Sequence, residues 1–116
     1  MNRGNSQPVL EAMRSEFPFL ADATEAYALG DVWGRTVLDD RTRQIAAVAA
    51  FAAMGETGMM SVHAGYALNI GVPAEELKEA IYLVTVTSGF PPAIAASQAL
   101  SKVIAQHAVT PGGKQK

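Results

Sequence analysis

Residues 40–54 read DRTRQIAAVAAFAAM, and this stretch decides the fold class of the 116-residue chain. From Ile45 to Met54 every residue is Ile, Ala, Val, Phe or Met, and six of these ten are alanine, the strongest helix former. The acidic pair Asp39-Asp40 suits the positive end of a helix that starts here. Because no polar stripe remains to face water, we predict a central helix, buried by its own fold or by a second subunit.

Glycine and proline divide the rest of the chain into further helical segments. The apolar spacing within them predicts helices at about 8–16, 18–29, 57–69, 73–88 and 92–107. Residues 81–87 are rich in β-branched side chains, but a lone strand would have no partner in this chain, so we predict a helix there too. The sequence therefore predicts an all-α fold of about six helices.

Two glycines are expected to mark helix ends. Gly30 follows the 18–29 segment and is predicted to end it, and Gly71 is predicted to end the 57–69 helix in a left-handed conformation. The polar or breaker-rich stretches 1–7 and 109–116 are predicted to be flexible tails. Residues 8–108 are then expected to form one helical domain.

Composition favours an oligomer and argues against two kinds of partner. Half the residues (49%) are apolar and only 17% are charged, below the roughly 25% that is usual, so apolar surface is expected to remain exposed on a folded monomer. A net charge of −2 offers no strong field for nucleic acid or an anionic membrane. The chain has no cysteine, and neither a secretory signal nor a membrane span is apparent, so a cytoplasmic location is the default expectation.

His63 is the first candidate for chemistry. It is the one histidine within the apolar body of the chain, and imidazole exchanges a proton near neutral pH. Helical spacing places it on one face with Met59, Tyr66 and Ile70, which makes burial the expected outcome. The alternative is a core histidine that is hydrogen-bonded and has no chemical role.

Several short motifs occur in an order that suggests a known family. They are Gly30-Asp31-Val32-Trp33-Gly34-Arg35, Leu38-Asp39, Arg41-Thr42-Arg43, the alanine-rich helix, His63, Asn69-Ile70-Gly71-Val72, Glu75-Glu76-Leu77, Glu79 and Ser88-Gly89-Phe90-Pro91. Together they resemble the carboxymuconolactone decarboxylase family over roughly residues 20–105. The resemblance implies an all-helical, alkyl hydroperoxidase D-like fold that assembles into rings, commonly hexamers built from dimers or trimers, with pockets at subunit contacts.

The resemblance also implies a reaction, the decarboxylation of a small carboxylated lactone in aromatic-acid breakdown, with no metal or organic cofactor. Such a reaction needs a donor for the developing oxyanion, an acid that protonates carbon, and a cation that orients the carboxylate. His63 is the candidate for either of the first two roles, and Arg35 and Arg43 are the candidates for the third. Since burial favours neutral imidazole, an acidic His63 would need a carboxylate such as Glu56 or Glu25 beside it.

A second branch of the superfamily, the thiol peroxidases, is excluded by the residues present. Their relay uses a glutamate, a C-x-x-C pair and two histidines. When its last histidine is aligned with His63, Glu56 and Met59 fall at the cysteines, Gly58 at the other histidine and Gln44 at the glutamate. Because the chain has no cysteine elsewhere, the thiol step has no substitute.

Four further side chains are candidate walls of a substrate pocket: Trp33, Met59, Tyr66 and Phe90. Aromatic rings and soft methionine side chains would suit an apolar ring, although each of these residues is equally suited to plain packing. The three arginines of residues 35–43 also fit a solvated cluster that pairs with nearby aspartates. The alternative to an enzyme is therefore a non-catalytic helical oligomer that serves as a binding or scaffold protein.

Overall fold

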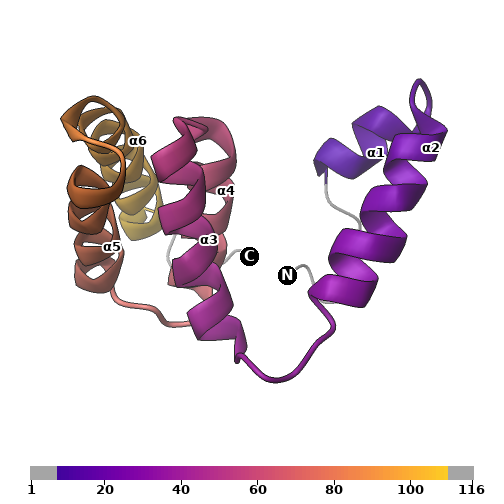
Figure 1. The fold of residues 1–116 in the computed structure, drawn as a ribbon, viewed down its shortest axis with the longest axis horizontal. Helices are drawn as coiled ribbons and strands as arrows, with labels where there is room; N and C mark the ends of the chain where they lie inside the picture. Colours follow the sequence, from indigo (N-terminus) through magenta and orange to yellow (C-terminus); the bar gives the residue numbers. More distant parts are fainter. Residues whose placement is uncertain (1–7, 110–116) are drawn as a thin grey trace. The chain divides into compact units, whose positions relative to one another are not determined.

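The computed structural model describes residues 8–109, and every regular element in that range is helical (Figure 1). The elements are α1 (Pro8–Arg14), α2 (Pro18–Ala23), the π-helix η1 (Thr24–Val32), α3 (Asp40–Met54), α4 (Thr57–Asn69), α5 (Ala74–Thr87) and α6 (Phe90–Val109). The predicted all-α class is confirmed, and residues 81–87 are helical as expected. The tails predicted at 1–7 and 110–116 lie outside the described residues, and Val109, expected in the second tail, ends α6.

The chain divides into two compact units, the first ending at Leu38 and the second beginning at Asp39. In the first unit α2 continues directly into η1, so that one helical stretch changes from α to π hydrogen bonding. Its end was predicted wrongly: the helix passes through Gly30 and ends at Val32. Gly30 keeps a negative φ, and the wider π turn continues in the bond from the Trp33 N–H to the Ala28 carbonyl, 2.9 Å.

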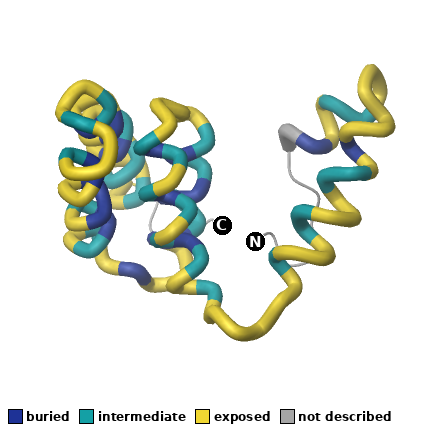
Figure 2. Tube along the Cα trace, in the orientation of Figure 1, coloured by how far each residue is buried: buried dark blue, intermediate teal, exposed yellow. Residues whose placement is uncertain are grey.

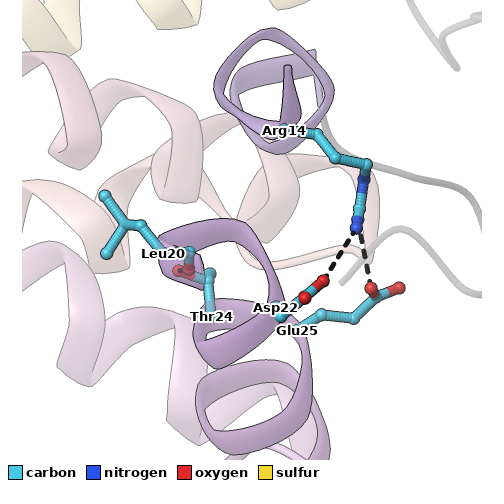
Figure 3. A network of polar contacts seen from close by, with 5 residues as sticks. All are labelled: Arg14, Leu20, Asp22, Thr24 and Glu25. Atoms are coloured by element: carbon cyan, nitrogen blue, oxygen red, sulfur yellow. Dashed lines mark hydrogen bonds and ion pairs between the residues drawn. The ribbon is translucent and has the colours of Figure 1, made fainter. Parts of the chain in front are cut away.

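Polar contacts join the helices of the first unit (Figure 3). The Arg14 guanidinium, on α1, lies 3.3 Å from the Asp22 carboxylate and 3.1 Å from that of Glu25. The hydroxyl of Thr24 donates to the Leu20 carbonyl at 2.8 Å, where the helix changes type. The hydrogen bond to Glu25 raises the pKa of Arg14, although all three charged groups are exposed to solvent.

The second unit is a four-helix assembly with one continuous core. Contacts run between α3 and each of α4, α5 and α6, and α6 also packs on α4 and α5. Buried positions recur along all four helices (Figure 2), and the largest fully buried side chains are Met60, Leu77, Val48, Val72 and Val84. The alanine-rich helix α3 contacts the other three helices but buries only Gln44, Val48 and Ala52, so its predicted burial is confirmed on one face, and burial by a second subunit stays a prediction.

Local signals fix the ends of α3 and α4. The Asp39 carboxylate accepts a hydrogen bond of 2.8 Å from the Thr42 N–H and caps the start of α3. Gly55 ends α3 with φ 78°, and Gly71 follows α4 with φ 97°, the left-handed conformation predicted for it. Gly55 turns the chain so that α4 packs on α3, whereas the turn at Gly71 leads into α5, which packs on α3 and α6.

One face of the second unit remains apolar and open. Ala46, Ala50 and Met54 of α3 are exposed, and so are Leu83 and Val86 of α5. A hollow of about 460 Å³ lies between these helices, with Ile45, Ala46, Ala49, Ala80 and Leu83 among its lining residues and Glu76 and Glu79 as its charged members. Within residues 8–109, no helix is both long enough and apolar enough to cross a membrane.

Candidate acid–base site

His63 lies in the middle of α4 and is buried, with 4% of its surface exposed. Its neighbours one helical turn away on the same face are fully buried in the core: Met60 before it and Ala67 after it. The predicted burial of His63 is therefore confirmed, but the predicted face is wrong at Ile70, which is 45% exposed. A buried imidazole is costly unless its nitrogens have partners, so its surroundings decide what it does.

Two aromatic rings enclose the imidazole. Phe51 of α3 stacks on it with 5.4 Å between ring centroids and 25° between ring planes. Tyr66, one turn along α4, presents its edge at 5.7 Å and 88°. The two rings limit the orientations that His63 can take.

The hydrogen-bond partner of the ring is Gln44, a side chain on α3 that is only 2% exposed. Its Oε1 lies 2.8 Å from Nδ1 of His63, across 19 positions of sequence. An amide oxygen only accepts, so Nδ1 donates its hydrogen in this contact. The contact gives both buried polar side chains a partner, and it contains no carboxylate.

Burial shifts the pKa of His63 below its ordinary value of 6.5, because desolvation disfavours the charged imidazolium. Gln44 is neutral and supplies no opposing charge. The resting state at neutral pH is therefore the uncharged imidazole. This agrees with the expectation that burial favours the neutral form, and a carboxylate beside His63 stays a prediction.

The remaining candidates of the second unit lie at different depths. Arg43 directly precedes Gln44 on α3 and is half-buried, and Met59 and Tyr66 are half-buried on α4. Glu56, at the start of α4, is exposed, and Phe90, at the start of α6, is 66% exposed. The structure thus brings Tyr66 directly to His63, while the roles of Arg43, Glu56, Met59 and Phe90 stay predictions.

The other candidates belong to the first unit. Arg35 is exposed and follows η1, whereas Trp33 is half-buried at the end of that helix. Glu25, the second carboxylate suggested for His63, accepts a hydrogen bond from Arg14 within the same unit at 3.1 Å. The pocket roles of Arg35 and Trp33 stay predictions.

Gln44 is the residue that sequence reasoning missed as a site member. The relay alignment placed it at the position of the glutamate and interpreted it as a lost group. One signal was available, since Gln44 stands one helical turn before Val48 and two turns before Ala52 on the buried face of α3. A polar residue on that face needs a partner in the core, and His63 is the other buried polar side chain described.

Comparisons with known proteins identify the family of this chain. Residues 18–102 match the model of the carboxymuconolactone decarboxylase family. A 4-carboxymuconolactone decarboxylase from Acinetobacter baylyi is 31% identical over 85 residues. That match covers 73% of this chain and 63% of the relative, so the chain spans somewhat less than two thirds of the relative's length. These matches show that this chain belongs to the carboxymuconolactone decarboxylase family.

Proposed function

We propose that this protein is a cofactor-free carboxy-lyase that removes carbon dioxide from a small carboxylated lactone, with His63 as its proton carrier. The observation that carries the proposal is the buried imidazole hydrogen-bonded to Gln44 within a family-matched helical core. The relative that is named a 4-carboxymuconolactone decarboxylase suggests the class of substrate. Family membership alone would support several chemistries, and the geometry around His63 favours proton transfer.

In the proposed step, the bond between ring carbon and carboxylate breaks and carbon dioxide leaves. The electron pair passes through the ring alkene to the lactone carbonyl oxygen, and a proton added to carbon gives the enol-lactone. One proton is consumed in each turnover. His63 would take this proton from solvent and deliver it to carbon, returning to the neutral state in which it began.

The charge of the substrate gives a neutral histidine a way to become the acid. Burial lowers the pKa of His63, but a bound carboxylate nearby would favour the imidazolium and raise that pKa again. Protonation would then accompany substrate binding. Arg43, half-buried beside Gln44, and Arg35 are our candidates for orienting the carboxylate through paired hydrogen bonds.

The test is turnover of 4-carboxymuconolactone by the purified protein, followed as carbon dioxide release. We expect His63→Gln to lose roughly 10²- to 10⁴-fold in kcat, the usual contribution of a positioned acid–base group. His107→Gln, which changes the other histidine of the chain, is the matched control and should keep wild-type turnover. No turnover of this compound or related lactones would overturn the proposal, and an active His63→Gln would assign the proton to another group.

A non-catalytic scaffold is the second candidate, and one observation favours it. His63 is almost fully enclosed, and neither the hollow between α3 and α5 nor a smaller one of about 230 Å³ between α5 and α6 includes it. A scaffold would show no turnover and would keep its assembly in His63→Gln.

We also propose that the protein is a homo-oligomer, a trimer or a hexamer. Large apolar side chains remain exposed in both units, among them Phe19, Val37 and Val86, each more than four-fifths exposed. Covering such surface is a common driving force for association. Light scattering after chromatography should give three or six times the 12.2 kDa chain mass, and a monomer would contradict this proposal.

A further inference from the structure

We propose that Gln44 is a positioning residue that fixes the tautomer of His63, placing hydrogen on Nδ1 and making Nε2 the nitrogen that exchanges the proton. The proposal stands on the 2.8 Å contact between Gln44 Oε1 and His63 Nδ1 and on the burial of both side chains. Its consequence for turnover rests on the proposed function. The tautomer itself is a property of the resting protein and is measured without substrate.

The acceptor at Nδ1 determines the tautomer. Neutral imidazole carries one hydrogen, on either nitrogen, and the nitrogen that faces an acceptor must carry it. A glutamine oxygen accepts but never takes the proton away at ordinary pH. Gln44 therefore holds the Nδ1 hydrogen in place in both the neutral and the protonated ring, and only Nε2 changes its state.

The packing around the ring keeps this geometry fixed. Phe51 stacks on the imidazole and Tyr66 lies nearly at right angles to it, so both rings hold the plane of His63. A half-turn of the ring within that plane would put Cδ2 in place of Nδ1 and lose the hydrogen bond to Gln44. Gln44 and Phe51 both belong to α3, two helical turns apart. One helix thus supplies the hydrogen-bond acceptor and the stacking surface for a histidine on the next.

A neutral acceptor has a different effect from a charged one. A carboxylate at position 44 would hold the same hydrogen but would also stabilise the imidazolium, so the ring would rest with its charge. Glutamine orients the ring without charging it. In the resting protein Nε2 carries no hydrogen, and it gains a proton when an anionic ligand binds. This division of roles is the specific content of the proposal.

The deciding measurement is the ¹⁵N chemical shift of the two ring nitrogens of His63 in the full-length, ¹⁵N-labelled protein, at about pH 8 where imidazole is neutral. We expect Nδ1 to show the shift of a protonated nitrogen and Nε2 that of an unprotonated one. The reverse pattern in the wild-type protein would overturn the proposal. This result needs no variant, so it stands even where a substitution impairs folding.

Three variants separate positioning from a structural role. Gln44→Leu removes the acceptor and should convert His63 to a mixture of tautomers or to the opposite one. Gln44→Glu retains an acceptor and should keep the hydrogen on Nδ1. Gln98→Leu, at an exposed glutamine of α6, should change neither shift. An unchanged tautomer in a folded Gln44→Leu protein would also overturn the proposal.

Kinetics provide the readout that depends on the proposed function. Gln44→Leu should lower kcat by roughly tenfold with little change in KM, because the acid is misdirected while substrate contacts remain. A rise in KM alone would contradict a positioning role. If the wild-type protein turns over no lactone, the proposed function fails, while the ¹⁵N shifts still decide the role of Gln44.

Discussion

The unit that begins at Asp39 buries a continuous core drawn from four helices, whereas the unit that ends at Leu38 buries only Leu10 and Ala21 among its described hydrophobic side chains. The helices of the first unit have 6 to 9 residues and those of the second have 13 to 20. The difference lies in how many helices surround each apolar side chain, because a large buried volume needs several helices. The second unit is therefore expected to be stable by itself, and the first to depend on contact with further apolar surface.

The largest expected effect compares one leucine from each unit. Leu77→Ala, at a fully buried position of α5, should cost about 2–5 kcal/mol of unfolding free energy through lost packing and a cavity. Leu20→Ala, at a leucine of the first unit that is 51% exposed, should cost about 1 kcal/mol or less. Denaturant unfolding measures both, and equal losses would mean that another surface covers Leu20.

Smaller changes in stability are expected when one glycine of each unit is replaced by alanine. A Cβ added at Gly34 would lie 2.4 Å from the Gly30 carbonyl oxygen, so Gly34→Ala should destabilise the end of η1 by about 1–3 kcal/mol. Hydrogen exchange should show the change confined to the first unit. Gly65→Ala on α4 meets nothing within 4 Å and should stabilise the second unit by about 0.5–1 kcal/mol. Destabilisation by Gly65→Ala would indicate that another molecule packs there.

The pH dependence of the second unit should follow His63. Burial lowers the pKa of His63 in the folded state. As the pH falls below 6.5, His63 therefore becomes protonated in the unfolded chain before it does in the folded one. Stability should therefore fall as the pH falls through 6.5 and level off below the folded-state pKa, with no such contribution above 6.5. Thermal unfolding across this window should show a shallower fall in His63→Gln than in the wild type or in Gln98→Leu. Identical profiles would contradict burial of a neutral imidazole.

The smallest effect on stability is expected from Asp39, which caps the first helix of the second unit. The Thr42 N–H bonded to Asp39 holds the pKa of that carboxyl below 3.8, so the stabilisation is present above pH 3.8 and is lost as the pH falls through the folded-state value. Asp39→Ala should lower Tm by a few degrees at neutral pH, and Asp39→Asn should retain most of the cap. Equal losses in both variants would assign the effect to charge.

The helices could be predicted from the sequence because their signals are local. An alanine run, an acidic cap and the left-handed Gly71 place α3 and α4 to within a residue. Gly30 was misleading because a glycine in a π turn looks the same in the sequence as one that ends a helix.

The site was predicted in part. Burial of His63 follows from helical spacing, but its partner lies on another helix, and no spacing within one helix reveals such a contact. Sequence reasoning sought a carboxylate because an acid requires charge, and the packing of α3 on α4 supplies an amide. A polar residue on an apolar helix face was the available clue.

Gly55 and Gly71 have a consequence for how this chain tolerates change. Both are exposed, and a Cβ at either would meet no neighbour within 4 Å, so by burial alone they would be counted among the freely variable positions. Their positive φ angles make almost any side chain unfavourable. If every residue were substituted in turn, Gly55 and Gly71 should tolerate as few replacements as the buried core positions. Their solvent exposure would not reveal this.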